Sequence, residues 1–221
     1  YMAAVMTMTA ALILSFSRGA LLLGIPVALA TLILFWGGRR AVAVLSRLGV
    51  LVLLTLFALS GNPRVAELVN VSTGPTFFRI NLWRSTLNMI RDVPMTGVGL
   101  DNFLYAYRGG YIAPAAWEEP NLSHAHNWVL DLAARLGLPG LAVGLWILAA
   151  FFQIGARVRR HIGDLDLGVL MSGLLASMVD FLAHGMVDAS YWFVDLAFAY
   201  MLAMGLIVRL GNMVQSELQV G

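Results

Sequence analysis

The stretch SHAHNWVLDLAARLGLPG, residues 123–140, is where a long polar segment passes into an apolar helix. Two of the four histidines in the chain, His124 and His126, stand at the entrance to that helix. Histidine is the side chain whose ordinary pKa lets it take up or release a proton near neutral pH. If the helix crosses a membrane, this entrance is suited to proton-transfer chemistry on a substrate held at the lipid boundary.

The composition of the 221 residues is that of a membrane protein. Hydrophobic residues make up 60% and charged residues 12%, whereas soluble domains contain about 25% charged residues. A soluble domain of this length could not bury so much apolar surface, so we expect an all-α, polytopic protein in a lipid bilayer. The absence of cysteine excludes disulfides, thiolate metal sites and cysteine nucleophiles. The net charge of +2 gives no indication of nucleic-acid binding.

Apolar runs predict about six transmembrane helices, since a span needs about 20 apolar residues. The spans are expected at residues 1–14 (truncated), 20–36, 41–60, 138–155, 167–187 and 192–208. The chain then divides into helices at 1–60, a long loop at 61–137, and helices with a short tail at 138–221. The first run has no basic residues before it, so we expect it to be the end of a helix with further helices preceding it, not a signal peptide.

Arginines predict the orientation of these spans, because short cytoplasmic loops are enriched in basic residues. The connection 37–40 contains two arginines, the connection 156–161 contains three, and Arg209 follows the last span. With six spans, these three places fall on the same side, which is then the cytoplasmic one. The loop 61–137 is consequently expected on the outer side.

The long loop is expected to contain helices of its own. Residues 76–92 have helical spacing, and their apolar side chains share one face: Phe77, Ile80, Trp83, Leu87 and Ile90. Pro94 ends this helix, and residues 95–99 (MTGVG) form a glycine turn. A loop of this length with its own secondary structure usually carries function.

Three arginines could bind a phosphate at the outer membrane surface. Arg18 lies at the outer end of the second span, where an arginine either grips a polar ligand or snorkels to the headgroups. Arg79 and Arg84 lie in the predicted 76–92 helix and suit an anionic, lipid-linked substrate. For these two, the sequence alone slightly favours a solvated helix face against anionic headgroups.

His126 is the candidate general base, and His124 is a supporting or structural residue. On a helix, residues two positions apart point about 200° away from each other, so the pair could not easily share one task. Asn127 is suited to orient His126 or to cap the following helix. A third histidine or a cysteine is missing nearby, so the sequence gives a metal site little support.

Asp180, His184 and Asp188 recur every four residues on one face of the fifth predicted span. Ionisable residues inside a span are candidates for function, such as a proton relay or the lining of an aqueous cavity. The alternative is a polar ladder that fixes helix packing, and the sequence favours this second interpretation.

Four segments together resemble the O-antigen ligase and polymerase family of bacterial inner-membrane glycosyltransferases. They are SFSRGA at 15–20, RINLW at 79–83 running on to DVPMTGVGLDNF at 92–103, SHAHN at 123–127 running on to LGLPG at 136–140, and HGMVD at 184–188. Their order, spacing and shared outer-face location make the resemblance fairly specific. It covers nearly the whole chain and corresponds to the family's C-terminal half.

The resemblance implies an enzyme that moves a glycan from undecaprenyl diphosphate to an acceptor hydroxyl on the periplasmic side of the bacterial inner membrane. By motif, Arg18 and Arg79 correspond to the arginines that hold the diphosphate, with Arg84 as a reserve. His126 corresponds to the histidine that activates the acceptor. The resemblance implies no metal or nucleotide cofactor.

The acceptor is left open between lipid A core, another repeat unit and a protein side chain. These acceptors would make the chain a ligase, a polymerase or an oligosaccharyltransferase. A ligase is favoured because the histidine stretch and both arginine motifs occur together. Two other classes are alternatives: a transporter or lipid flippase that uses Arg18 and the Asp180–His184–Asp188 ladder, and a membrane scaffold whose loop binds a partner. Transporters often contain repeated halves, and this chain has no internal repeat.

Overall fold

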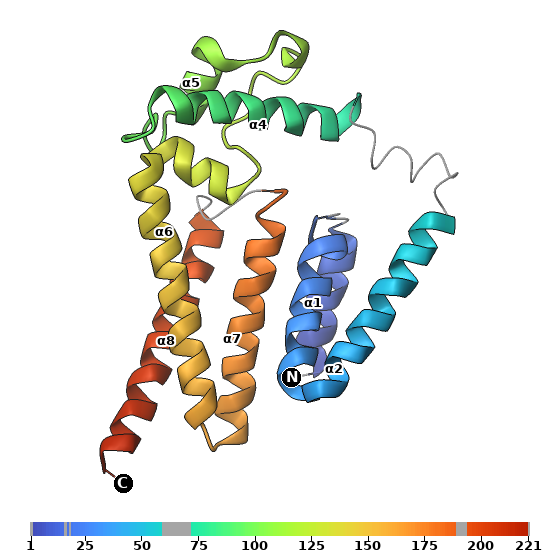
Figure 1. The fold of residues 1–221 in the computed structure, drawn as a ribbon, viewed down its shortest axis with the longest axis vertical. Helices are drawn as coiled ribbons and strands as arrows, with labels where there is room; N and C mark the ends of the chain where they lie inside the picture. The colour runs from blue at the N-terminus through green and yellow to red at the C-terminus, as the bar shows by residue number, and fades with distance from the viewer. Residues whose placement is uncertain (1, 16, 18, 59–71, 189–193, 221) are drawn as a thin grey trace. The chain divides into compact units, whose positions relative to one another are not determined.

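A computed structural model describes residues 2–15, 17, 19–58, 72–188 and 194–220. Every element of secondary structure in these ranges is a helix, as Figure 1 shows. The predicted all-α class is therefore confirmed for the described part of the chain. The helices form two compact units. We call residues 38–146 the loop unit, and residues 1–37 with 147–221 the span unit.

The span unit is built from apolar helices. It contains α1 (Met2–Leu14), the π-helical turn η1 (Ala20–Gly24), the first part of α2 (Ile25–Ala58), the second part of α6 (Trp128–His161), α7 (Leu165–His184) and α8 (Val194–Val220). Helix α7 packs against η1 and against α8. A Cβ added at Gly155 of α6 would lie 2.5 Å from Leu175 of α7 and 3.0 Å from Ile207 of α8. The missing side chain thus allows these three helices to approach closely.

Four helical stretches of the described residues are long and apolar enough to cross a membrane. They are Ala20–Gly38, Trp128–His161, Leu165–His184 and Leu196–Ser216, while Met2–Leu14 is apolar but shorter. The span predicted at 41–60 coincides with α2 as far as Ala58, and its end lies outside the described residues. The structure thus indicates a multi-pass membrane protein with four candidate spans, and the count of six stays a prediction.

Two long helices are interrupted at glycines. Gly38 in α2 has φ 55° and ψ −140°, and Gly137 in α6 has φ 71° and ψ −178°. Glycine adopts positive φ readily because it has no Cβ. The first break falls at the predicted connection 37–40. The second lies just before Leu138, where the fourth span was expected to begin, and it divides α6 into a segment after the histidines and a longer apolar segment.

The loop unit contains several short helices around one core. They are α4 (Gly74–Asp92), α5 (Phe103–Ala106), the π-helical turn η2 (Tyr107–Tyr111), the 3₁₀ turn η3 (Pro114–Ala116) and the first part of α6. The second part of α2 also belongs to this unit. Helix α4, green in Figure 1, packs against η2 and η3. The core consists of Leu82, Met89, Phe103, Tyr107, Ile112, Ala125 and Ala134. The helix predicted at 76–92 is therefore confirmed, and it begins two residues earlier than expected.

The buried face of α4 differs from the predicted apolar face. Its buried residues are Asn81, Leu82, Ser85, Thr86 and Met89, whereas Leu87 of the predicted face is 42% exposed. Polar side chains can be buried here because they bond to the backbone one turn back. Asn81 Nδ2 donates to Phe77 O at 3.0 Å, and Thr86 Oγ1 donates to Leu82 O at 2.8 Å. The prediction of the face was wrong because these residues are satisfied within their own helix.

Candidate functional site

A small cavity in the loop unit brings together residues from three segments. It has a volume of about 110 Å³ and is lined by Pro75, Phe78, Arg79, Leu82, Glu119, Leu122 and His126. Arg79 comes from α4, Glu119 follows η3, and His126 precedes α6. The Arg79–His126 cavity therefore combines a cation, a carboxylate and an imidazole. Two of the residues selected from the sequence, Arg79 and His126, lie in it together.

The histidine loop, residues 123–127, precedes α6 and is not helical. The ring centroids of His124 and His126 are 4.2 Å apart. The expectation that the two side chains point away from each other was wrong, because it assumed helical geometry. His126 has φ 49°, the single positive φ outside glycine in the described residues. For an L residue this conformation costs about 1–2 kcal/mol, so neighbouring contacts have to maintain it.

Hydrogen bonds tie the histidine loop to the helices on either side. Trp83 of α4 donates its indole N–H to Ala125 O at 2.9 Å. Asn127 Oδ1 accepts the backbone N–H groups of Val129 and Leu130, both at 3.1 Å. Asn127 is thus the N-cap of α6, which is one of the two roles that the sequence left open for it. Because Trp83 lies one turn after Arg79, the same helix presents the arginine and holds the loop that carries His126.

A family model described as O-antigen ligase matches residues 3–145. This range is 143 of the 221 residues and includes Arg79, Glu119 and His126. The chain belongs to the O-antigen ligase family. This family consists of membrane ligases and polymerases of the glycosyltransferase kind, which use lipid-linked glycans. No curated protein matches the chain.

In this O-antigen ligase family member, Glu119 is a cavity residue that the sequence analysis did not select. It lies in an irregular segment where no periodicity points to it. Its charge acts on the phenol of Tyr107, which is completely buried and has no hydrogen-bond partner for its hydroxyl among the described residues. Burial raises the pKa of Tyr107 above its ordinary value, and the negative charge of Glu119 raises this pKa further. The phenol therefore stays neutral beside the carboxylate at physiological pH.

The structure describes only one of the other two predicted arginines. Arg84 is exposed on α4 and is not among the residues that line the cavity. Arg18 lies outside the described residues. Their roles in binding a diphosphate therefore stay predictions.

The Asp180–His184–Asp188 ladder lies in the span unit, and two of its members, Asp180 and His184, pack against glycines. A Cβ added at Gly24 would overlap Asp180 Oδ1, and one at Gly19 would lie 2.7 Å from the His184 ring. His184 Nε2 is 3.3 Å from Asp188 Oδ2. The two glycines let α7 approach η1 closely, and this favours a role of the ladder in helix packing.

Two buried charged residues that the sequence analysis did not select lie under the histidine loop. Asp131 is 1% exposed and Arg135 is 7% exposed, and Arg135 Nε lies 2.9 Å from Asp131 Oδ2. A sequence signal for this pair does exist. Opposite charges four positions apart, inside an otherwise apolar helical run, predict a buried ion pair, because an unpaired buried charge is very costly.

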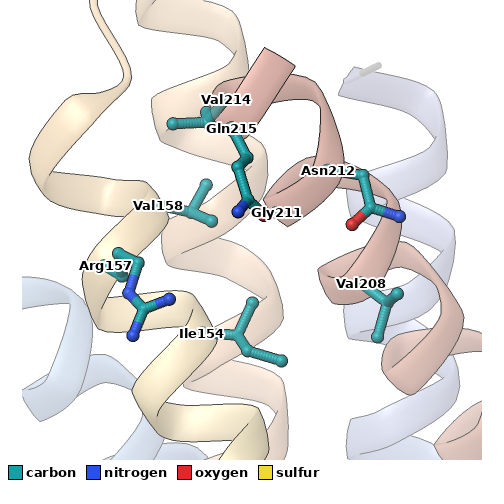
Figure 2. Close-up of a pocket in the computed structure, with 8 residues that line it drawn as sticks. All are labelled: Ile154, Arg157, Val158, Val208, Gly211, Asn212, Val214 and Gln215. Carbon is teal, nitrogen blue, oxygen red and sulfur yellow. The ribbon is translucent and has the colours of Figure 1, made fainter. Parts of the chain in front are cut away.

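A second cavity, of about 420 Å³, lies between α6 and α8 in the span unit. Figure 2 shows its lining residues: Ile154, Arg157 and Val158 from α6, and Val208, Gly211, Asn212, Val214 and Gln215 from α8. None of the site residues predicted from the sequence is among them. The candidate site is therefore the Arg79–His126 cavity.

Proposed function

We propose that this O-antigen ligase family member transfers a glycan from undecaprenyl diphosphate to an acceptor hydroxyl. The observation that carries the proposal is the single cavity lined by Arg79, Glu119 and His126. A guanidinium binds phosphate oxygens through its fork of donors, and an imidazole can accept a proton. A cavity of about 110 Å³ can hold a few water molecules. It is large enough for the reacting groups of the two substrates, while the rest of the glycan and the polyprenyl chain would lie outside it.

The chemistry is a direct displacement at the anomeric carbon. The acceptor oxygen forms a bond to that carbon while the bond to the diphosphate oxygen breaks, so the anomeric configuration inverts. His126 takes the proton of the acceptor hydroxyl, a contribution of about 10²–10⁴-fold for a general base. The departing diphosphate gains negative charge, so arginines aimed at it stabilise the transition state more than the ground state. Arg79 and Arg18 have this role, with Arg84 as a reserve.

His124 and Asn127 have supporting roles in this chemistry. His124 contacts the ring of His126, and Asn127 caps the helix that follows. We place the loop 61–137 on the periplasmic face of the bacterial inner membrane, between the spans of 1–60 and 138–221. Lipid A core is the proposed acceptor, which makes the protein a ligase. A polymerase or a protein oligosaccharyltransferase would use the same donor and differ in the product.

The test is transfer by the full-length protein in proteoliposomes that contain undecaprenyl-diphosphate-linked glycan and a mixed acceptor extract. Loss of donor and the mass of the glycosylated product are followed for the wild type and for His126→Ala, Arg79→Ala and Arg91→Ala. Arg91 is an exposed arginine at the end of α4 and serves as the matched control. We expect transfer to fall about 10²-fold or more in the first two variants and to persist in the control.

The product mass identifies the acceptor class. Intact donor in the wild type with every acceptor offered would contradict the glycosyltransferase proposal. Wild-type transfer by His126→Ala would exclude His126 as the base even if the protein is a transferase.

A further inference from the structure

The guanidinium of Arg135 joins three separate parts of the loop unit. Its Nε donates to Asp131 Oδ2 at 2.9 Å, and its Nη2 donates to the carbonyl oxygen of Ser123 at 2.6 Å. Its Nη1 donates to the carbonyl oxygen of Leu100, and its Cζ lies 5.5 Å from the ring centroid of Phe103. A planar fork with five N–H donors can make these contacts together, whereas the ammonium group of a lysine cannot.

The carboxylate of Asp131 completes the support of the histidine loop. Its Oδ2 receives Arg135, and its Oδ1 accepts the backbone N–H of Ala125 at 3.0 Å. The pair therefore holds the carbonyl of Ser123 and the N–H of Ala125, the two backbone groups on either side of His124. Ala125 is itself completely buried. The residue immediately before His126 in the chain, Ala125, is therefore held in a fixed position.

These contacts account for the backbone conformation of His126. Its φ of 49° persists only where the surroundings determine it. The bond from Trp83 holds the carbonyl of Ala125, and the Asn127 cap holds the start of α6. The bonds of Asp131 and Arg135 hold the opposite side of the loop. Together with Trp83, these bonds anchor the residues that precede His126.

Stability is a weak reason for burying such a pair. Replacing a buried ion pair with apolar residues of similar size often leaves stability unchanged or raises it, whereas removing one partner is strongly destabilising. Apolar side chains would not make directional bonds to Ser123 and Ala125. The particular contribution of the pair is therefore the geometry of the loop.

We propose that Asp131 and Arg135 are positioning residues that hold the His126 imidazole in the cavity with Arg79 and Glu119. Neither residue touches the substrate; both act through the backbone of the histidine loop. The functional consequence rests on the proposed function in one respect, namely that His126 is the general base. The positioning itself does not depend on that role.

The first experiment measures turnover in the full-length protein with Asp131→Asn, Arg135→Lys and the control Arg91→Lys. Asp131→Asn keeps an acceptor for Ala125 but loses the charge, and Arg135→Lys keeps the charge but loses the fork. We expect kcat per folded molecule to fall about 10²-fold, the loss typical of a misplaced catalytic group, with an unchanged KM for the lipid-linked donor. The control should match the wild type. Unchanged kcat per folded molecule in both variants would overturn the inference.

A combined Asp131→Leu/Arg135→Met variant separates positioning from folding, because it removes both charges and fills the space. We expect its melting temperature in detergent to match or exceed that of the wild type, while its kcat is as low as in the single variants. Wild-type kcat in this folded variant would overturn the inference.

The second experiment tests whether the pair acts through His126. In a His126→Gln background, adding Asp131→Asn should cause no further loss of kcat. An equal fold-loss from Asp131→Asn in the wild-type and His126→Gln backgrounds would overturn the inference.

A third measurement does not depend on catalytic turnover. It is the rate at which diethyl pyrocarbonate modifies His126, followed by mass spectrometry of the peptide that contains this residue. We expect this rate to change in Asp131→Asn and Arg135→Lys but not in Arg91→Lys.

The outcomes distinguish the two proposals. An unchanged modification rate at His126 would overturn the positioning role, whatever happens to transfer. Wild-type activity of His126→Gln would overturn the base role, while an altered modification rate would still support the positioning of the ring.

Discussion

The loop unit and the span unit use the same polar residue types in different ways. In the loop unit, Asp131 makes directional hydrogen bonds that hold the histidine loop, and His126 of this loop lines a small cavity. In the span unit, Asp180 and His184 occupy the space left by Gly24 and Gly19. A histidine and an aspartate in a membrane protein can therefore build a site or pack a helix. The neighbouring groups distinguish the two uses. In the loop unit the residues lie beside a cavity and backbone donors, and in the span unit they lie against glycines.

The largest effect on stability is expected for a substitution at Gly97, because this glycine packs directly against the backbone of Arg135. Gly97 has φ 63°, and a Cβ there would lie 2.5 Å from the carbonyl carbon of Arg135. The neighbouring bonds Val98 N–H to Ala134 O, at 2.8 Å, and Gly99 N–H to Arg135 O, at 3.0 Å, prevent the two segments from separating. We expect Gly97→Ala to lower the free energy of unfolding by about 3 kcal/mol, from backbone strain and overpacking together.

Thermal unfolding in detergent measures this change, and Arg135→Ala provides the matched test. Trimming Arg135 to its Cβ leaves its carbonyl in place, so the double variant should be no more stable than Gly97→Ala. Recovery of stability in the double variant would show that the Cβ added at Gly97 meets the Arg135 side chain and not its backbone. Glycines of the two units would then not differ in whether they meet backbone or a side chain.

A smaller effect is expected at Gly24, where a glycine meets a side chain. Its added Cβ would overlap Asp180 Oδ1, and overpacking of this kind costs about 1–3 kcal/mol. Because the obstacle is a side chain, Asp180→Ala should restore the stability of Gly24→Ala. Gly173→Ala, on the same helix as Asp180 but with no atom near its added Cβ, is the control and should be neutral or stabilising. Absence of rescue by Asp180→Ala would contradict the packing role of the ladder.

The smallest effect is expected at an exposed bond of the loop unit. The hydroxyl of Tyr111 donates to Asp92 Oδ2 at 2.7 Å. This bond raises the pKa of Tyr111, and burial and the charge of Asp92 raise it further. The fold therefore favours the neutral phenol. Its contribution to stability is complete below the ordinary pKa of 10.0 and is lost as the pH rises through the higher pKa of the folded state.

Tyr111→Phe should remove this pH dependence and change the free energy of unfolding only slightly. We expect a change of about 0.3 kcal/mol, because a solvent-exposed interaction is weak. The melting temperature, measured at alkaline pH for the wild type, Tyr111→Phe and the exposed control Tyr105→Phe, tests this. Equal alkaline loss of stability in the wild type and Tyr111→Phe would contradict the assignment.

The features that the sequence predicted correctly are local ones. Apolar runs predicted a helical membrane protein, helical spacing predicted α4, and the residue type at Asn127 made it a candidate for the cap of α6. Each depends on residues within a few turns of one another. The packed face of α4 could not be predicted in this way, because Asn81 and Thr86 satisfy their polar groups within the helix and resemble surface residues.

The candidate site was only partly predictable for the same reason. Arg79 and His126 were selected as separate motifs, but their shared cavity depends on how α4 packs against the segments that precede α6. Glu119 carries no local signal, since its role follows from that packing. The bonds of Arg135 to Leu100 and Ser123 connect residues far apart in the sequence, and no periodicity encodes them.

The most direct test of the account compares two histidines in one assay. Transfer of glycan from undecaprenyl diphosphate is measured in proteoliposomes for His126→Gln and His184→Gln, normalised to folded protein. We expect His126→Gln to lose about 10²-fold or more of the transfer activity, while His184→Gln keeps activity close to that of the wild type. Loss of activity in His184→Gln with normal transfer by His126→Gln would contradict the account and would place the function in the ladder of the span unit.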